Sequence, residues 1–268
     1  MTDQGFQTII EVVPPAGWDA APLLASLASL DGLPIARFSV ATNPVAKARM
    51  SAMVMCELIQ RRTGRPATLH CTTRDHNRLS LQAMLWGARA LGIDSVMIAT
   101  GDMVALGDRA TTSTVRDLDV YDLIAMAREA GLQTGVVFDH HPEINGLETA
   151  VRRLEKKVAA GAQFVVTQPV YDQAGVDMIA SATHGFGIPV ILGILPLRTP
   201  RHAEFLHNKV AGIAVPDSVR ARMHNARDAV AEGVAIAKEV FALAGERFAG
   251  ACLMPPFDHY EILADVLR

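Results

Sequence analysis

The stretch that decides the fold reads Ser95-Val96-Met97-Ile98-Ala99-Thr100-Gly101-Asp102, an apolar run that ends in a hydroxyl residue, a glycine and a carboxylate. The run is too short for an independent helix and is bounded by turn residues at 92–94 and at Gly101. This pattern is typical of a strand buried on both faces in a parallel sheet. Gly101 would let the backbone turn sharply, and Asp102 would then lie at the carboxyl end of the strand. On the local sequence alone, the plain alternative, that Gly101-Asp102 simply begins a solvated loop, is slightly favoured.

Similar short apolar runs recur along the whole chain and alternate with segments of helical periodicity. The predicted strands lie at 6–13, 36–41, 68–72, 95–99, 133–138, 164–168, 189–195 and 251–254. The predicted helices lie at 18–30, 46–62, 75–91 (with Asp75 as its cap), 120–130, 147–160 and within 200–243. Strand–helix alternation indicates parallel pairing, and eight strands favour a closed barrel over an open sheet. No GxGxxG follows the first strand, and no change in composition marks a linker. We therefore predict an α/β protein, a single (β/α)8 TIM barrel over residues 1–268.

The bulk composition excludes several classes of protein. The chain has 268 residues, 50% of them hydrophobic, which is close to the ~250 residues of a typical barrel. Its net charge of −3, with no basic block, makes nucleic acid and anionic membranes poor candidate partners. No apolar run approaches the ~20 residues of a membrane span, and the first thirty residues do not resemble a signal peptide. Cys56, Cys71 and Cys252 share no CxxC spacing, which is typical of reduced thiols in a cytoplasmic protein.

Polar residues follow the predicted strands at the end where barrel enzymes place their functional groups. They are Glu11, Asn43, His70, Thr72, Asp102, His140, His141 and Gln168. Each has an ordinary structural explanation when taken alone. Glu11 stands within Ile-Ile-Glu-Val-Val, where burial would raise the carboxyl pKa and suit a general acid near neutral pH. Asp102 could then serve as the permanent charge beside it.

Other chemistries have weaker signals. The adjacent pair His140-His141 diverges on any strand, and no HxH or HExxH occurs, so we predict no metal site. No GxSxG occurs, and Cys71 should face the side of its strand opposite to His70. Lys157 lies in the last turn of a predicted helix, where it could interact with the helix dipole or contact a phosphate.

Six short motifs occur in a fixed order. They are Glu11 followed by Pro14-Pro15, His70-Cys71-Thr72 with Arg74-Asp75 and Asn77, Thr100-Gly101-Asp102, His141-Pro142-Glu143, Lys157 before Ala160-Gly161-Ala162, and Thr167-Gln168-Pro169. Together with the segment 193–196, their order resembles the methylenetetrahydrofolate reductase family from residue 9 to about residue 216. The segment 253–257 and Tyr260-Glu261 look more like the reductase modules fused to homocysteine methyltransferases.

The resemblance implies a barrel with non-covalent FAD. Such a protein reduces 5,10-methylenetetrahydrofolate to 5-methyltetrahydrofolate with NAD(P)H, by ping-pong kinetics, in the one-carbon metabolism that feeds methionine biosynthesis. It implies that Glu11 protonates N10 of the folate and that Asp102 lies near the flavin and the pterin. Gln168 would contact folate and nicotinamide in turn. The implied flavin contacts are His70, Thr100, Gly101, Asp102, Phe138, His141 and Lys157, and the implied folate contacts also include His202 and His259.

The chain departs from the enteric pattern of that family at several positions. Residues 41–44 lack an aromatic flavin contact, Thr100 replaces an arginine, and Phe138 replaces a tyrosine. His202 and the Asp258-His259 pair replace a glutamine and an arginine that bind folate. FMN, or no flavin, is therefore an alternative cofactor state. A flavin-free or folate-binding subunit of a methyltransferase assembly, or a proline dehydrogenase-like flavin enzyme, is an alternative function. A homo-oligomer or a separate partner subunit is also open.

Overall fold

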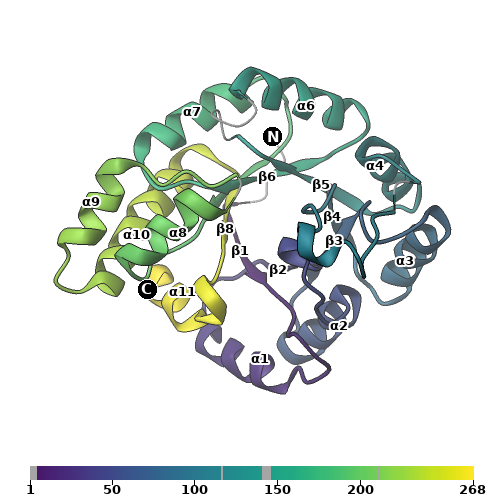
Figure 1. Cartoon of the computed structure of the whole chain (residues 1–268), viewed down its shortest axis with the longest axis horizontal. Helices are drawn as coiled ribbons and strands as arrows, with labels where there is room; N and C mark the ends of the chain where they lie inside the picture. Colours follow the sequence, from purple (N-terminus) through teal and green to yellow (C-terminus); the bar gives the residue numbers. More distant parts are fainter. Residues whose placement is uncertain (1–4, 116, 141–145, 211) are drawn as a thin grey trace.

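The computed structural model describes residues 5–115, 117–140, 146–210 and 212–268, and over these residues eight parallel strands close into a barrel (Figure 1). Each strand pairs with the next one along the chain, and β8 closes the barrel against β1. The strands are β1 (Gln7–Val12), β2 (Arg37–Val40), β3 (Ala67–Thr72), β4 (Ser95–Ala99), β5 (Gln133–Phe138), β6 (Phe164–Pro169), β7 (Val190–Ile194) and β8 (Gly250–Leu253). The predicted TIM barrel is therefore confirmed.

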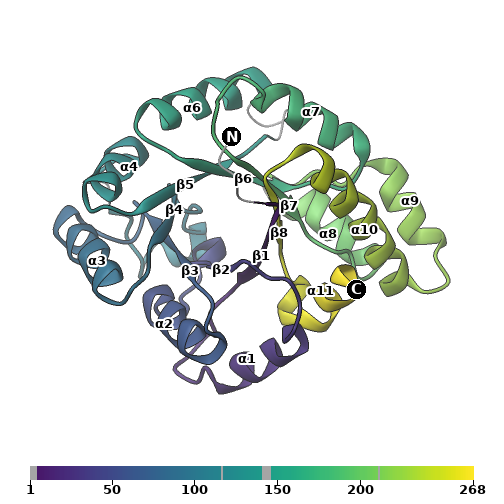
Figure 2. The same ribbon diagram turned by 180° about the vertical axis from the view of Figure 1, so that it is seen from behind.

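Helices form a ring around the barrel and cover its outer face (Figures 1 and 2). The α-helices are α1 (Ala21–Ser26), α2 (Ala52–Thr63), α3 (Arg78–Ala90), α4 (Val120–Glu129), α6 (Leu147–Ala159), α7 (Gln173–Thr183), α8 (Pro200–Lys209), α9 (Asp217–Asn225), α10 (Ala229–Arg247) and α11 (Tyr260–Leu267). Short 3-10 segments are η1 (Leu27–Leu30), η2 (Pro44–Ala46), η3 (Leu106–Asp108) and η4 (Pro256–Asp258). No helix in the described part of the chain combines the length and the hydrophobicity that a membrane span requires.

The strands bury alternate side chains on opposite faces. Ile10 and Val12 face outward into the main core between barrel and helices, whereas Ile9 faces the interior. The interior cluster consists of Ile9, Met97, Phe164, Val166, Ile191 and Cys252. A Cβ atom at Gly135 would lie 2.2 Å from the Phe164 ring, so this ring lies directly over β5. These side chains fill the barrel interior toward the amino-terminal ends of the strands, and the polar residues lie nearer to the carboxyl-terminal ends.

The structure differs from the predicted elements in three places. Helix α2 begins at Ala52 rather than 46, because residues 44–46 form η2. Asp75 does not cap α3; the side chain of Asn77 accepts from the Ser80 amide instead. The sequence pattern also did not predict α7 or α11. Gly175 lies in the first turn of α7, and because glycine disfavours helices it argued against a helix here. The helix is capped by the side chain of Asp172.

Two glycines of α10 make a matched test of the packing. A methyl group at Gly233 would lie 1.7 Å from the Leu197 carbonyl oxygen, whereas a methyl group at Gly245 would meet open space. We expect Gly233→Ala to lower the free energy of unfolding by about 2–3 kcal/mol through overpacking. We expect Gly245→Ala to raise it by about 0.5–1 kcal/mol through helix propensity. Urea unfolding of both variants measures this difference, and equal effects would contradict the packing described.

Candidate active site

Glu11 faces the barrel interior one layer above the apolar cluster. It lies two residues beyond Ile9 on the same face of β1, and it pairs in register with Ser39 of β2. The side chain is partly exposed at the carboxyl-terminal mouth, yet burial raises its pKa from 4.5 to about 7. The carboxyl group can therefore both hold and release a proton near neutral pH.

Ser39 and His70 bring two further polar groups to the interior. The His70 Nε2 and the Ser39 Oγ share a hydrogen bond of 2.7 Å. Burial lowers the pKa of His70 to about 4, so the imidazole is neutral near pH 7. Cys71 is buried in the outer core, on the opposite face of β3, and burial raises its pKa to about 12. The predicted alternation of His70 and Cys71 is confirmed, and Cys71 is not a nucleophile for this site.

Arg74 joins three loops at the mouth. Its guanidinium is buried and donates to both carboxylate oxygens of Asp75, at 2.6 and 2.7 Å. It also donates to the carbonyl oxygens of Asn43 and Asp102, each at 3.1 Å. The loops after β2, β3 and β4 are thus held together by one side chain. The sequence indicated Arg74 only as part of a motif; its position two residues beyond β3 was the available signal.

Asp102 is exposed, and its carboxylate forms a hydrogen bond to the loop between β2 and α2. Its Oδ2 accepts from the Val45 amide at 2.5 Å. Asn43, Val45 and Ala46 all have positive φ angles, of 40°, 49° and 55°, which are costly for residues other than glycine. Gly101, at φ 89°, is packed so that a Cβ atom would lie 3.0 Å from the Arg74 Cβ. Glycine is therefore required here for packing onto β3.

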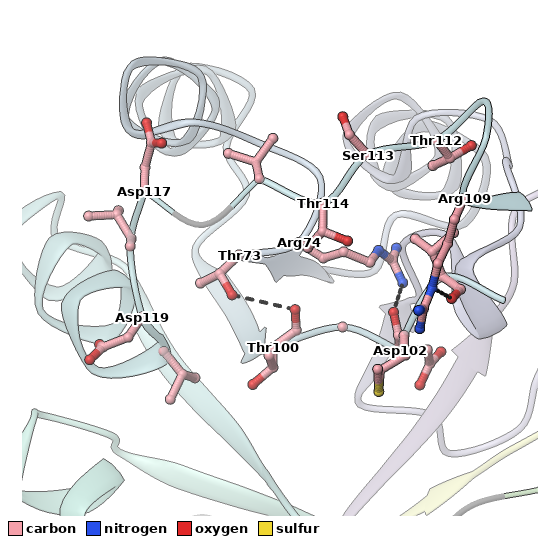
Figure 3. Close-up of a pocket in the computed structure, with 16 residues that line it drawn as sticks. Thr73, Arg74, Thr100, Asp102, Arg109, Thr112, Ser113, Thr114, Asp117 and Asp119 are labelled. Carbon is pink, nitrogen blue, oxygen red and sulfur yellow. Dashed lines mark hydrogen bonds between the residues drawn. The ribbon is translucent and has the colours of Figure 1, made fainter. Parts of the chain in front are cut away.

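A cavity at this face, cavity 1, has a volume of about 790 Å³ and lies beneath the long loop between β4 and α4 (Figure 3). Its lining includes Thr100, Gly101 and Asp102, which the sequence predicted as binding residues. The rest of its polar lining consists of hydroxyl, guanidinium and carboxylate groups, from Thr73, Arg74, Arg109, Thr112, Ser113, Thr114, Asp117 and Asp119. Glu11 and Gln168 do not line it.

A second cavity, cavity 2, has a volume of about 450 Å³ and adjoins cavity 1 at Thr100 and Val120. It brings together Thr100, Phe138 and Lys157, three of the predicted cofactor-binding residues. It also contains Arg153, which sequence reasoning missed. Arg153 stands four residues before Lys157, and this spacing places both on one face of α6.

Lys157 is a half-buried cation of cavity 2. Its Nζ donates to the Val137 carbonyl oxygen at 2.7 Å, so it reaches β5 instead of remaining at the end of its helix. Burial lowers the Lys157 pKa, the Asp139 carboxylate raises it and the Arg153 charge lowers it by a smaller amount, so that the pKa is about 8. Cavity 2 thus contains two cations, Lys157 and Arg153, together with the Asp139 carboxylate, whose charge acts on Lys157.

Gln168 is the second-last residue of β6, in the stretch where the pairing with β7 shifts register between Val166 and Pro169. A Cβ atom at Gly212 would lie 3.2 Å from the Asp139 Oδ1 and 3.6 Å from the Gln168 Nε2. The chain at Gly212 therefore approaches both side chains closely. Gln168 lies in β6 and Asp139 follows the neighbouring strand β5, and both side chains lie beside the backbone at Gly212.

The two histidines predicted to bind folate are both engaged with protein groups. The His202 Nδ1 accepts from the Arg198 amide at 3.3 Å, and its ring centroid lies 4.9 Å from that of Phe257. Burial, with a smaller effect of Arg198, lowers the His202 pKa to about 4. His259 pairs with Glu261 at 2.5 Å. His141 lies outside the described residues.

Across the described ranges, no three His, Cys, Asp or Glu side chains are grouped closely enough to hold a metal ion. The fold and the mouth define a (β/α)8-barrel protein with an acid inside the barrel and two adjoining cavities at the carboxyl-terminal face. Residues 2–247 match the family model described as methylenetetrahydrofolate reductase, and the chain belongs to this family.

Relatives with curated names share limited parts of the chain. A protein of Caenorhabditis elegans named probable methylenetetrahydrofolate reductase (NADPH) is 28% identical over 141 residues, which cover 48% of this chain and 20% of that protein. A 5,10-methylenetetrahydrofolate reductase of Pectobacterium carotovorum subsp. carotovorum is 25% identical over 144 residues, covering 52% and 46%. The matched regions thus span less than half the length of each of these relatives.

Solved structures resemble the whole chain in fold. A protein of Clostridium thermocellum, described as binding two copies of 5-methyl-5,6,7,8-tetrahydrofolic acid, has a TM-score of 0.70 at 15% identity. The alignment covers 98% of this chain and 93% of that one. The tryptophan synthase α-subunit of Pyrococcus furiosus has a TM-score of 0.53 at 14% identity, covering 95% and 88%. At these identities the likeness concerns the fold alone.

The raised pKa of Glu11 predicts a specific dependence of stability on pH. Because the pKa is raised from 4.5 to about 7, the folded state binds this proton more tightly than the unfolded chain. The stability due to the proton is complete below pH 4.5 and is lost as pH rises through 7. Relative to that of Glu11→Gln, the free energy of unfolding of the wild type should fall by up to about 3 kcal/mol as the pH rises from 4.5 to above 7. Urea unfolding at several pH values measures the difference; a constant difference would contradict the buried position of Glu11.

Proposed function

We propose that this protein reduces 5,10-methylenetetrahydrofolate to 5-methyltetrahydrofolate with electrons from NAD(P)H, transferred through a bound flavin. The observation that carries the proposal is the carboxyl group of Glu11, held inside a barrel of this family with a pKa of about 7. The names of the two curated relatives support the same reaction. The folate bound by the Clostridium thermocellum protein supports the substrate class.

Glu11 acts as the general acid in this proposal. The bond between N10 and the bridging methylene group breaks, its electron pair goes to N10, and N10 takes the proton of Glu11. The methylene carbon stays on N5 as an iminium cation, which then accepts a hydride. A pKa near the working pH suits this transfer, because the acid is protonated before the step and stable as a carboxylate after it.

Asp102 and Gln168 position the folate in this proposal. The Asp102 carboxylate is a fixed negative charge at the mouth that can stabilise the iminium cation. For Oδ2 to contact a ligand, the Asp102 carboxylate has to give up the hydrogen bond that it accepts from the Val45 amide. The amide of Gln168 can both donate and accept, which suits a group that meets the pterin and the nicotinamide alternately.

Cavity 2 fits the nucleotide part of a flavin. Lys157 and Arg153 would hold its phosphates, while Thr100 and Tyr121 supply hydroxyl groups at the same cavity. Two cations match a diphosphate better than a single phosphate, which favours FAD over FMN. When bound, the flavin supplies the hydride, and NAD(P)H and folate use it in turn with ping-pong kinetics.

Two alternatives have less support from the geometry. A proline dehydrogenase-like enzyme needs a pair of arginines for a carboxylate, but Arg74 is already bound by Asp75 and by two carbonyl groups. A flavin-free folate-binding subunit would leave cavity 2, with its volume of about 450 Å³, without a ligand. The three cysteines are free and buried, which fits our proposal of a cytoplasmic protein.

The decisive experiment separates the two half-reactions. Anaerobic NAD(P)H should bleach the flavin of the purified protein, and methylenetetrahydrofolate should restore its colour. In Glu11→Gln the bleaching should be nearly unchanged, whereas the recovery should slow by about a hundredfold or more. Stopped-flow absorbance measures both. Equal slowing of both halves would contradict the role of Glu11, and a colourless protein would favour the flavin-free alternative.

The cations of cavity 2 can be tested by flavin binding alone. We expect Arg153→Ala to weaken the binding of FAD about tenfold through loss of a charged hydrogen bond, and to leave riboflavin unaffected. Arg152→Ala is the matched control, because Arg152 is exposed on the same helix and pairs with Glu148 at 2.5 Å. Fluorescence titration of the apoprotein measures both affinities. Equal loss in the two variants would mean that Arg153 acts only through general charge.

A further inference from the structure

A third cavity, cavity 3, opens at the amino-terminal end of the barrel, opposite the mouth that holds the candidate active site. It has a volume of about 280 Å³ and is lined by residues near the starts of β1, β2, β5, β6, β7 and β8. Among the described residues it shares no lining residue with cavity 1 or cavity 2. Cavity 3 is therefore a separate space, and the proposed reaction makes no use of it.

The inner wall of cavity 3 is the apolar cluster of the barrel interior. Ile9, Phe164 and Ile191 belong both to this cluster and to the lining of the cavity. Pro189 and Ala249 add further apolar surface. A molecule that enters cavity 3 thus meets an aromatic ring and branched aliphatic side chains, which suit a flat apolar body.

Arg37 is the only charged side chain in the described lining of cavity 3, and it is weakly neutralised. Its Nη1 donates to the Thr68 Oγ1 at 3.1 Å and lies 3.5 Å from the Asp94 Oδ1, whose side chain is 54% exposed. Within the described residues its Nε and Nη2 form no hydrogen bond. Because a long ion pair to an exposed carboxylate contributes little, a second carboxylate in the cavity would find unused donors on Arg37.

The rest of the polar lining is uncharged and consists of the glutamine side chains of Gln7, Gln133 and Gln163. The Gln163 Oε1 accepts from the Arg128 guanidinium and, at 3.1 Å, from the Thr134 amide. The side-chain NH₂ of Gln163 is thus the part that remains to donate. With no acidic residue in the described lining, the cavity does not repel an anion.

A buried hydroxyl group at the same end of the barrel also lacks a partner. Ser95 begins β4 and pairs in register with Thr68 on one side and with Gln133 on the other. Its side chain points into the barrel, as does that of Met97 two residues later. The Ser95 Oγ is fully buried and forms no hydrogen bond within the part of the chain that the structure describes. Since such a group is costly to leave unsatisfied, hydrogen-bonding capacity is unused beside cavity 3.

We propose that cavity 3 is a binding site for a small aromatic monocarboxylate, a single flat ring that carries one carboxylate group. The ring packs against Phe164 and Ile191, and the carboxylate pairs with Arg37. The volume of about 280 Å³ favours a ligand of one ring, because it lies just below the range of cavities that enclose drug-sized molecules. The apolar cluster separates this site from Glu11, so the proposal does not rest on the proposed function.

The test is a calorimetric titration of the full-length protein with benzoate and with benzamide, its neutral analogue. The wild type should bind benzoate saturably and more tightly than benzamide. Arg37→Gln should raise the Kd of benzoate about tenfold and that of benzamide by less than about threefold, because it removes the charge and keeps a polar side chain. Arg62→Gln is the matched control, since Arg62 lies outside the cavity and has an ion pair of similar length, 3.4 Å, to Asp31. It should leave both Kd values unchanged.

Two substitutions at Ala249 test the apolar part of the site. Ala249→Leu adds three carbon atoms at the wall of the cavity, and it should raise the Kd of both benzoate and benzamide about tenfold or more by taking up the space of the ring. Ala249→Ser keeps the volume of the cavity and should stay within about threefold of the wild type for both ligands. Urea unfolding establishes that each variant is folded, and Arg37→Gln decides by itself should Ala249→Leu fail to fold.

A titration in the presence of 5-methyltetrahydrofolate locates the site. Because cavity 3 lies at the other end of the barrel, saturating folate should leave the Kd of benzoate unchanged. Competition between the two ligands would place benzoate at the mouth and overturn the inference. So would the absence of saturable benzoate binding by the wild type, an unchanged Kd of benzoate in Arg37→Gln, or an equal loss in Arg62→Gln.

Discussion

The two-residue repeat of the strands is the constraint on which the rest of the structure depends. In a closed barrel every second side chain must share one narrow interior, and the others must pack against the helices. The interior can therefore hold a polar group only where space remains above the apolar cluster of Ile9, Met97, Phe164, Val166, Ile191 and Cys252. Glu11 occupies such a position. Its raised pKa follows from this placement, because desolvation acts on it inside the barrel.

Local patterns in the sequence were sufficient to predict the barrel. Eight short apolar runs, separated by helical segments, determine strand order once parallel pairing and right-handed connections are assumed. The environment of Glu11 was also predictable, because its neighbours on both sides are β-branched or apolar. By contrast, Asp75 was wrongly expected to cap a helix. An acidic residue before a helix suits a cap, but a buried arginine beside it forms the stronger, bidentate contact.

Contacts between distant segments were not predictable from one sequence. Arg74 binds carbonyl groups of two other loops, and no periodicity records which carbonyl groups lie within its reach. The same holds for Arg153: helical spacing places it on the same face as Lys157, but only the packing of α6 on β5 turns that face into a cavity. Left-handed residues such as Val45 and Phe257 were missed for a related reason, since their own sequence disfavours the conformation and tertiary contacts impose it.

The apolar cluster beneath Glu11 has a consequence for the supply of protons. Water cannot cross that layer readily, because the Phe164 ring lies over β5 and its neighbours are buried. Solvent then reaches the carboxyl group from one direction only, the side from which a ligand also enters. A bound folate would close that route, so Glu11 would have to take up its proton before the folate binds. In the proposed reaction, Glu11 would therefore give up one proton for each bound folate and regain it from solvent after the ligand has left.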